Sequence, residues 1–446
     1  MPEIPKFRPP GPEPHFLIGN FPLGSRDPLG LLATWAHQFG DIFYYRAGWI
    51  HVYFLNHPDH IESVLLTHHQ NFVKDRVIRN SRWLFGEGLL TSEGAHWLRE
   101  RRLSQPAFHR ERIASYARTM TAYTEEMLAT WRGGETRDIH QEMMHLTVKI
   151  VAKVLFNVEV TEETDKVASE LNVLMQQGSG GRMVLPAFLR YLPLPVMWRV
   201  RQAARQLDDI VYRIIRQRRG SAGDTGDLLS MLLEAQDEDG SRMTEQQLRD
   251  EAMTFLLAGH ETTALALSWT WYLLSQHPKV EQRLQQELQQ VLSDRTPRAE
   301  DLAWLPYTEK VVKEAMRLYP PAWSLARTAA KECEIGGYRV PAGANVVMSQ
   351  WIMHRDPRFY ANPEEFDPDR WSTDRIQCLP KFAYFPFGGG PRSCIGASFA
   401  MIEATLLLAT IAQRFQMRMV PTHPVVPTPS ITLRPRNGIR MVLHER

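Results

Sequence analysis

The sequence predicts a mainly α-helical protein with small β-sheets, of the α+β class. From Pro58 onward, apolar residues recur at helical spacing in one segment after another. Aromatic and β-branched residues over 41–56 flank Ala47-Gly48 and predict a β-hairpin, and a strand-rich stretch at about 324–350 and a β-like tail add further strands. No Gly/Ser or Pro linker divides the chain cleanly, so we expect residues 1–446 to form a single domain.

The composition excludes several classes of protein. Hydrophobic residues make up 43% and charged residues 23% of the chain, which is typical of a globular protein and not of a disordered one. The 52 Lys and Arg residues nearly balance the 50 Asp and Glu residues, so we expect no nucleic-acid binding. Without an apolar signal segment or an apolar run of about 18 residues, we expect no secretion and no transmembrane anchor. Three cysteines are too few for a disulfide framework, which favours a reduced, cytoplasmic setting.

The expected elements follow from local patterns along the chain. Residues 1–28 are rich in Pro and Gly and predict an irregular, packed entry segment. Coil is expected over 355–392, where Pro and Asp are frequent. Helices are expected wherever apolar residues recur every three or four positions, which is the case at 58–67, 94–105, 110–132, 137–157, 162–176, 196–219, 245–277, 278–293, 308–319 and 396–415.

The helix expected at 245–277 has an unusual centre. Thr244 and Gln247 form a capping-box pattern at its start, and at about 1.5 Å per residue it is roughly 50 Å long. Its middle is apolar on most faces, which predicts burial, yet the polar run Gly259-His260-Glu261-Thr262-Thr263 interrupts it. Two interpretations stay open: a polar patch that neighbouring elements satisfy, or a local widening beside a ligand where a carboxylate and a hydroxyl relay protons. A zinc-protease motif is excluded, because Ala264 stands where the second His is needed.

The strongest chemical signal is the segment Phe387-Gly388-Gly389-Gly390-Pro391-Arg392-Ser393-Cys394-Ile395-Gly396. Its glycines permit positive φ angles and a close approach of the backbone to a flat ligand. Cys394 precedes an apolar helix, whose N-terminal dipole favours a thiolate. Arg392 can pair with a carboxylate of the same ligand. Cys333 and Cys378 lack such surroundings, and we expect them to be inert small hydrophobic residues.

This segment resembles the haem-binding loop of the cytochrome P-450 superfamily, F-x-x-G-x-R-x-C-x-G. Further motifs agree in the family's order, and Pro9-Pro10-Gly11-Pro12 suits the family's N-terminal proline segment, so the resemblance covers essentially the whole chain. It implies the cytochrome P-450 fold, with haem between the long central helix and the Cys loop, in a bacterial-type member of the fatty-acid or microsomal-like branch. The other motifs are Trp97-Leu98-Arg99-Glu100-Arg101 (W-x-x-x-R), Ala258-Gly259-His260-Glu261-Thr262-Thr263 (oxygen activation), Glu314-Ala315-Met316-Arg317 (E-x-x-R) and Phe366-Asp367-Pro368-Asp369-Arg370-Trp371, where Asp369 replaces the commoner Glu.

The resemblance implies a haem b site with the Cys394 thiolate as the iron ligand. Phe387 would cover the sulfur, and Thr262 would hydrogen-bond the bound O2 or its water. Glu261 would relay protons inward from solvent. The other residues that the family pattern assigns to haem are Gly388 and Gly396 in the loop, Arg392, Trp97, Arg101 and Arg327 at the propionates, and Ala258 and Gly259 on the oxygen side.

The remaining residues of the motifs are expected to be structural or to line a pocket. Glu314 and Arg317 are expected to form a buried network with Arg370, the alternative for this pair being a solvated surface contact. His354 is expected at the surface, with a propionate contact as the alternative. The substrate pocket is expected to include Leu257, Thr263, Ala322, Trp323 and Ser324, although Trp323 is equally well explained as plain core.

The implied activity is a monooxygenase that inserts one oxygen atom of O2 into a lipophilic molecule such as a fatty acid or terpenoid. Segments 75–92 and 184–202 are expected to be access lids, and contact of the second with a membrane surface is the less favoured interpretation. The chain leaves no room for a fused reductase after Cys394, so electrons would come from a separate ferredoxin or flavodoxin and its reductase. A basic cluster has two equally good explanations, a docking patch or a plain solvated basic face. It consists of Arg99, Arg101, Arg102, Arg110 and Arg112.

Two other functions remain as alternatives. The first is a haem-thiolate peroxygenase or isomerase that needs no external electrons, and the second is a haem protein without catalytic activity. The intact pair of Glu261 and Thr262 favours the monooxygenase over both.

Overall fold

The structure, a computed structural model, describes residues 8–13, 19–20, 27–157, 170, 195–220, 226–237 and 240–446. The chain forms two compact units. The β-rich unit consists of Met1–Arg79 and Met316–Cys394, and the helical unit consists of Asn80–Ala315 and Ile395–Arg446. The prediction of a single domain over the whole chain stays a prediction. Apart from residue 170, the helix expected at 162–176 lies outside the described residues.

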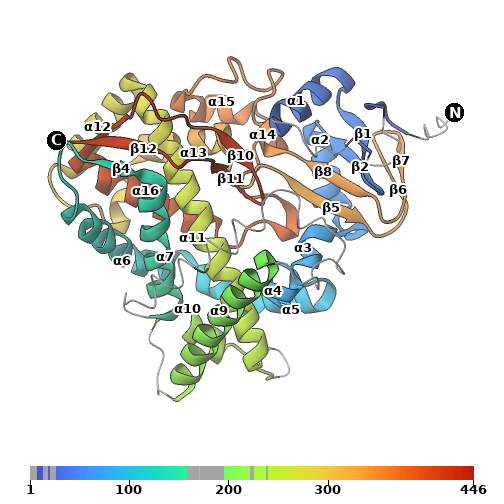
Figure 1. The fold of residues 1–446 in the computed structure, drawn as a ribbon, viewed down its shortest axis with the longest axis horizontal. Helices are drawn as coiled ribbons and strands as arrows, with labels where there is room; N and C mark the ends of the chain where they lie inside the picture. The colour runs from blue at the N-terminus through green and yellow to red at the C-terminus, as the bar shows by residue number, and fades with distance from the viewer. Residues whose placement is uncertain are drawn as a thin grey trace. The chain divides into compact units, whose positions relative to one another are not determined.

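The β-rich unit is built on a five-stranded sheet with the order β1-β2-β8-β5-β3 (Figure 1). The predicted hairpin is confirmed, since β1 (Ile42–Ala47) pairs antiparallel with β2 (Ile50–Leu55) across Gly48, whose φ is +60°. Strand β8 (Asn345–Met348) runs parallel to β2, and β5 (Leu325–Ala329) is antiparallel to both β8 and β3 (Phe72–Lys74). Strands β6 (Cys333–Ile335) and β7 (Tyr338–Val340) form a separate antiparallel pair.

Short helices complete this unit around two buried hydrophobic clusters. Across the hairpin, Phe43 and Phe54 are paired and stack at 4.6 Å between ring centroids, and both are fully buried. The helices and turns are α1 (Pro28–Phe39), α2 (Pro58–Glu62), the π-helical turn η1 (Ser63–Thr67), η2 (His69–Asn71), α3 (Arg76–Asn80), the end of α13 (Pro306–Leu318), α14 (Gln350–Met353), η7 (Pro368–Trp371), α15 (Thr373–Gln377), η8 (Lys381–Ala383) and η9 (Gly390–Arg392).

The helical unit centres on α11 (Glu245–Gln276), which packs against α7, α9 and α16. The predicted capping box is present: the Gln247 N–H donates to the Thr244 hydroxyl at 3.2 Å, and the Thr244 N–H donates to the Gln247 side chain at 2.8 Å. The predicted boundaries of the described long helices are confirmed to within three residues. These helices are α5 (Gly94–Ser104), α6 (Arg110–Ala129), α7 (Ile139–Phe156), α9 (Pro195–Gly220), α12 (Pro278–Leu292) and α16 (Ala397–Arg414), with shorter helices at α4 (Arg82–Phe85), η3 (Gln105–Phe108), α10 (Leu228–Glu234) and η6 (Ala299–Trp304).

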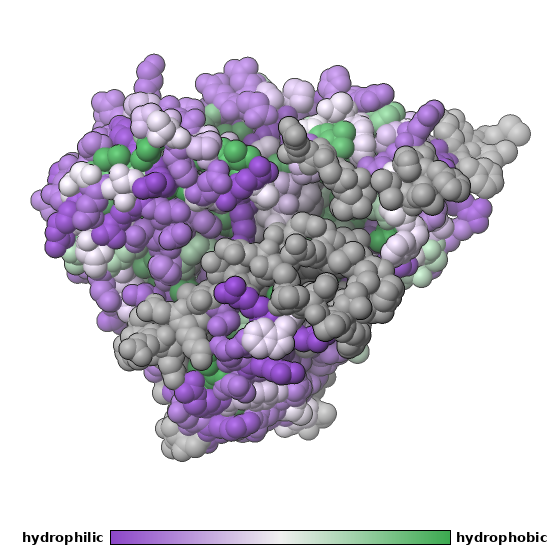
Figure 2. All heavy atoms as spheres, in the orientation of Figure 1, coloured by the Kyte–Doolittle hydropathy of each residue, from purple (hydrophilic) through white to green (hydrophobic). Residues whose placement is uncertain are grey.

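Two small sheets close the helical unit. One has the order β4-β12-β9, with β4 (Thr136–Asp138), β9 (Phe415–Met419) and β12 (Arg440–Glu445), and the other pairs β10 (Pro427–Pro429) with β11 (Leu433–Pro435). The C-terminal β-like tail is therefore confirmed. Among the residues that the structure describes, no helix combines the length and the hydropathy needed to cross a membrane. On the face drawn in Figure 2, hydrophobic residues appear as small separate groups within a mostly hydrophilic surface.

Candidate active site

The cysteine loop is a tight turn that only its glycines permit. Gly388 and Gly390 have φ angles of +70° and +67°, which side chains rarely allow. A Cβ on Gly390 would lie 1.8 Å from the Leu65 carbonyl oxygen in η1, so the backbone of the loop rests directly on that turn. The Cys394 N–H donates to the Phe387 carbonyl at 2.9 Å and closes the loop. Cys394 is exposed and forms no disulfide, so its thiol is accessible to a ligand.

A buried histidine supports the segment before this loop. His354 is 0% exposed, so the expectation that it lies at the surface is wrong. Its Nε2 accepts a hydrogen bond from the Phe385 N–H at 3.0 Å, and its ring packs on the ring of Tyr384 at 4.9 Å between centroids. Burial lowers the pKa of His354 well below its ordinary value, which keeps the ring neutral and able to accept.

The E-x-x-R helix ends in a buried arginine that organises the following coil. Arg317 is 0% exposed and donates to the carbonyls of His354 at 2.8 Å, Pro363 at 2.6 Å and Glu365 at 2.9 Å. Arg370 donates to the neighbouring carbonyls of Ala361 at 2.7 Å and Asn362 at 3.2 Å. Glu314 is also 0% exposed, so the solvated surface pair is excluded. Arg317 and Arg370 converge on residues 361–365, which agrees with a structural role.

The centre of α11 presents one small accessible face. Between Leu248 and Trp271 every residue is buried except Ala258, which is exposed, and Gly259 and Thr262, which are half-buried. Positions i, i+1 and i+4 share one side of a helix. The helix stays α-helical throughout, so the expected local widening is not present. Instead, the Thr262 hydroxyl donates to the Ala258 carbonyl at 2.9 Å within this face.

Glu261 points away from that face into the protein. It is 1% exposed, and its Oε1 accepts from the Thr432 hydroxyl at 2.6 Å and from Nε of Arg434 at 2.5 Å. Its Oε2 is buried and has no hydrogen-bond partner in the described part of the chain. The first interpretation of the polar run, a patch satisfied by neighbouring elements, therefore holds for Oε1, and the relay role stays a prediction.

The other residues assigned to haem or to the substrate pocket lie at very different depths. These residues come from both units. The β-rich unit contributes Cys394, Phe387, Gly388, Arg392, Arg327 and the pocket candidates Ala322, Trp323 and Ser324. The helical unit contributes Trp97, Arg101, Gly396 and Leu257. Arg327 is 8% exposed and donates to the Ala326 carbonyl at 2.9 Å. Leu257 is part of a buried hydrophobic cluster of its unit, and Trp97 packs against that cluster. Trp323 packs on the cluster around Phe43, as the plain-core alternative expects.

The predicted lid and docking residues are partly engaged in internal contacts. Residues 184–194 lie outside the described residues, and the rest of 184–202 forms the start of α9, where Trp198 is exposed. In the arginine cluster, Arg99 donates to Asp237 at 3.0 Å and to Ser241 at 3.1 Å, so its guanidinium is committed within the unit. Cys333 is half-buried and Cys378 is exposed, and the expectation that both are inert stays a prediction.

Sequence reasoning missed several polar groups of the helical unit. Thr432 and Arg434 carried no recognisable motif, because their link to Glu261 exists only once β11 packs on α11. Glu403 could have been noticed as a lone carboxylate inside the apolar helix α16, where it is fully buried. His140 lies near Arg434, and burial lowers its pKa to about 4.

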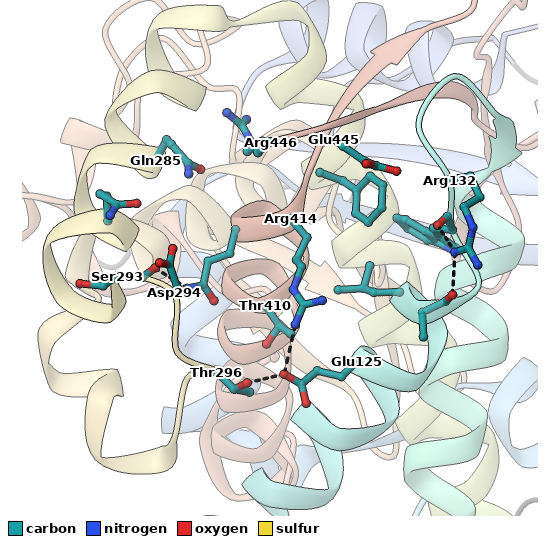
Figure 3. Close-up of a pocket in the computed structure, with 16 residues that line it drawn as sticks. Glu125, Arg132, Gln285, Ser293, Asp294, Thr296, Thr410, Arg414, Glu445 and Arg446 are labelled. Carbon is teal, nitrogen blue, oxygen red and sulfur yellow. Dashed lines mark hydrogen bonds and ion pairs between the residues drawn. The ribbon is translucent and has the colours of Figure 1, made fainter.

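A polar cavity of about 430 Å³ lies elsewhere in the helical unit and contains none of the predicted site residues (Figure 3). Its side chains come from α6, α12, α16 and the C-terminal strand. Glu125 accepts from the Thr296 hydroxyl and lies 3.8 Å from the Arg414 guanidinium, as the dashed lines in Figure 3 show. Arg446 is paired with Glu281 at 2.7 Å. These charges satisfy one another, so we treat the cavity as structural.

The residues present fit a haem with a cysteine ligand. The donor set suits it, because a single accessible thiol follows a glycine turn that holds the backbone in place. Gly390 adds a cradle that a Cβ would fill. On α11, the absence of large side chains at Ala258 and Gly259 leaves one accessible face beside the Thr262 hydroxyl.

Similar proteins identify the family of this chain. The family model Cytochrome P450 matches residues 9–441. Cyclooctatin synthase of Streptomyces melanosporofaciens is 39% identical over 421 residues, which cover 94% of this chain and 91% of that protein. Cyclooctat-9-en-7-ol 5-monooxygenase of the same organism is 38% identical over 408 residues, covering 91% and 88% of the two chains. The crystal structure of the cytochrome P450DA heme domain matches with a TM-score of 0.90 and 28% identity, covering 100% of this chain and 99% of that chain. The chain therefore belongs to the cytochrome P450 family, as a monooxygenase that uses O2 and haem with a cysteine ligand.

Proposed function

We propose that this monooxygenase hydroxylates a terpenoid-like lipophilic molecule, with haem b held by Cys394 and O2 handled at Ala258, Gly259 and Thr262. The observation that carries the assignment of residues is the accessible face at the centre of α11, since these three motif residues are the ones not buried between Leu248 and Trp271. When bound, the haem supplies the activation of O2 through its iron and thiolate ligand. The expected propionate partners are Arg392, Trp97, Arg101 and Arg327.

Thr262 is suited to hold a proton donor or water at the oxygen side. Its hydroxyl has one hydrogen, which it gives to the Ala258 carbonyl at 2.9 Å, and two lone pairs that remain to accept. It can therefore accept a hydrogen bond from a water at the accessible face while its own rotamer stays fixed by the helix. Removal of this hydroxyl is expected to leave the helix intact and to disturb only proton delivery.

The hydrogen-bond partners of Glu261 restrict which of its oxygens could relay a proton. Oε1 is fully engaged by Thr432 and Arg434, so a proton can pass only through Oε2. We propose that Arg434 fixes the carboxylate while Oε2 faces the path of the proton. The path from solvent then has to run along this side of α11.

The proposed substrate class is inferred from the names of the similar Streptomyces proteins. Two of them are named for cyclooctatin and for cyclooctat-9-en-7-ol, which are terpenoids, and this favours a terpenoid over a fatty acid. A ferredoxin or flavodoxin with its reductase is the proposed electron source, and Arg102, which is half exposed, is the better candidate for docking than Arg99. The proposed cytoplasmic setting follows from the cysteine count of three, which is too small for a disulfide framework.

The test is turnover with a separate ferredoxin and reductase, NADPH and isotopically labelled O2, using cyclic terpenes and fatty acids as two substrate panels. We expect a terpenoid product that carries one labelled oxygen atom. Thr262→Ala should keep the haem spectrum and consume NADPH, but should form product with at least tenfold lower coupling. Peroxide-supported turnover that exceeds turnover with the reductase would instead establish the peroxygenase, and unchanged coupling in Thr262→Ala would contradict the role of this hydroxyl.

A further inference from the structure

A buried arginine on α11 joins two neighbouring elements of the helical unit. Arg249 is 5% exposed, and it donates through Nε to Asp208 of α9 at 2.7 Å and through Nη2 to the Leu84 carbonyl of α4 at 2.9 Å. Its Nη1 donates to Asp250, the next residue of α11, at 2.9 Å. Both α4 and α9 pack on α11 (Figure 1). One guanidinium therefore binds a carboxylate of α9 and the backbone of α4 at the same time.

The loop of residues 84–88 rests directly on α11 beside this arginine. The Glu87 N–H donates to Oδ2 of Asp250 at 2.8 Å. Gly86 has a φ of +63°, and a Cβ on it would lie 2.0 Å from the carboxyl carbon of Asp250. Any side chain at Gly86 would therefore push the loop off the helix. The close contact between this loop and α11 is built into the sequence.

The 84–88 loop also borders the accessible face of α11. A Cβ on Gly88 would lie 2.5 Å from the Thr254 hydroxyl, so the loop lies against Thr254 as well. Thr254 is four residues before Ala258, which places the two residues one helical turn apart on the same side of α11. A movement of the 84–88 loop therefore changes the space next to Ala258.

The bond between Arg249 and Asp208 can open without unfolding the protein. The Asp208 side chain is 32% exposed, so water can replace the guanidinium, and Asp250 still compensates the charge of Arg249. Helix α9 stays attached through its apolar residues, which belong to the same buried cluster as Leu84 and Leu257. Opening therefore loosens α9 and the 84–88 loop relative to each other and leaves the core in place.

We infer that Arg249 is a positioning residue for substrate specificity, which holds α9 and the 84–88 loop together at the edge of the accessible face. While its bonds to Asp208 and Leu84 are made, large molecules are kept from this face and small ones pass. Large lipophilic molecules enter and leave only when the bond to Asp208 opens. The inference rests on the proposed function, because it assumes that the substrate reacts at this face.

Two variants release the elements separately. Asp208→Ala frees α9 and leaves Arg249 paired with Asp250, whereas Arg249→Met frees both α9 and the loop. We expect clotrimazole, a bulky azole that binds haem iron, to bind and dissociate about tenfold faster in Asp208→Ala, as expected for the loss of a hydrogen bond between charged groups. The rates should rise further in Arg249→Met. Imidazole is small, so its rates should be the same in both variants as in the wild type.

Stopped-flow absorbance of the haem-loaded protein measures these rates. Arg216→Met is the matched control, because Arg216 pairs α9 with Glu245 of α11 at 3.2 Å and does not contact the 84–88 loop, so its clotrimazole rates should be unchanged. Hydrogen exchange of the Glu87 amide reports whether the loop stays on α11, and it should become faster in Arg249→Met but not in Arg216→Met.

Unchanged clotrimazole rates in Asp208→Ala would overturn the inference, and so would imidazole rates that rise by the same factor as the clotrimazole rates. The first outcome alone decides the question if Arg249→Met does not load haem. Azole binding requires no turnover, so this failure is distinct from a failure of the proposed function, which would appear as missing terpenoid product in the wild type.

Discussion

Two buried carboxyl groups of the helical unit, Glu261 on α11 and Glu403 on α16, have opposite surroundings. Glu261 is held by Arg434 of β11 and by Thr432, which precedes that strand, with contacts of 2.5 and 2.6 Å. Glu403 is equally buried, neither of its oxygens has a hydrogen-bond partner among the described residues, and burial raises its pKa to about 8. Burial penalises the charged form of a carboxyl group, and a neighbouring cation offsets this penalty. Glu261 is bound by a cation and a hydroxyl, whereas the surroundings of Glu403 favour its protonated form.

The largest effect is expected when the partner of Glu261 is removed. Arg434→Met should leave an uncompensated buried carboxylate and should lower the free energy of unfolding by about 3–5 kcal/mol. Urea unfolding of the haem-loaded protein measures this loss. Arg436→Met is the matched control, because Arg436 is exposed on the same segment and bonds only Thr428 at 3.3 Å. Equal stability of the two variants would show that the ion pair does not hold Glu261.

The next effect is the dependence of stability on pH that Glu403 imposes. Its folded-state pKa lies above the ordinary value of 4.5, so between pH 4.5 and about 8 the unfolded chain releases a proton that the folded chain keeps. Stability should therefore fall as pH rises, by roughly 1.4 kcal/mol per pH unit within this window, and should show no further contribution from Glu403 above pH 8. Glu403→Gln should remove this slope. An unchanged slope would mean that Glu403 ionises normally and that the contrast between the two carboxyl groups is wrong.

The smallest effect is expected from the neutral partner of Glu261. Thr432→Val keeps the shape of the side chain and removes one hydrogen bond to a charged group, which should cost about 1.5 kcal/mol. In the double variant with Arg434→Met, the two losses of unfolding free energy should not be additive, because both residues bond Oε1 of Glu261. The double-mutant cycle, measured by the same urea unfolding, tests this coupling. Strict additivity would place the two residues on independent contacts.

The contrast also explains what the sequence could and could not reveal. The capping box at Thr244, the hairpin at Gly48 and the glycine turn before Cys394 are local features, so their residues alone predicted them correctly. The partner of Glu261 could not be predicted, because Arg434 lies 173 positions away and meets it only through packing of β11 on α11. His354 was placed at the surface because histidine usually lies there, whereas its burial follows from the tertiary support that Phe385 requires. Whether a side chain is buried, and which residue it bonds, depend on the packing of the core. The sequence alone shows the local patterns and not these tertiary contacts.

The identity of the iron ligand is the assignment on which the other roles depend. The ferrous–carbonyl spectrum of the purified haem-loaded protein tests it directly, with serine placed at each cysteine in turn. We predict a thiolate-type spectrum for the wild type, Cys333→Ser and Cys378→Ser, and its loss in Cys394→Ser. Retention of the thiolate-type spectrum by Cys394→Ser would contradict the account.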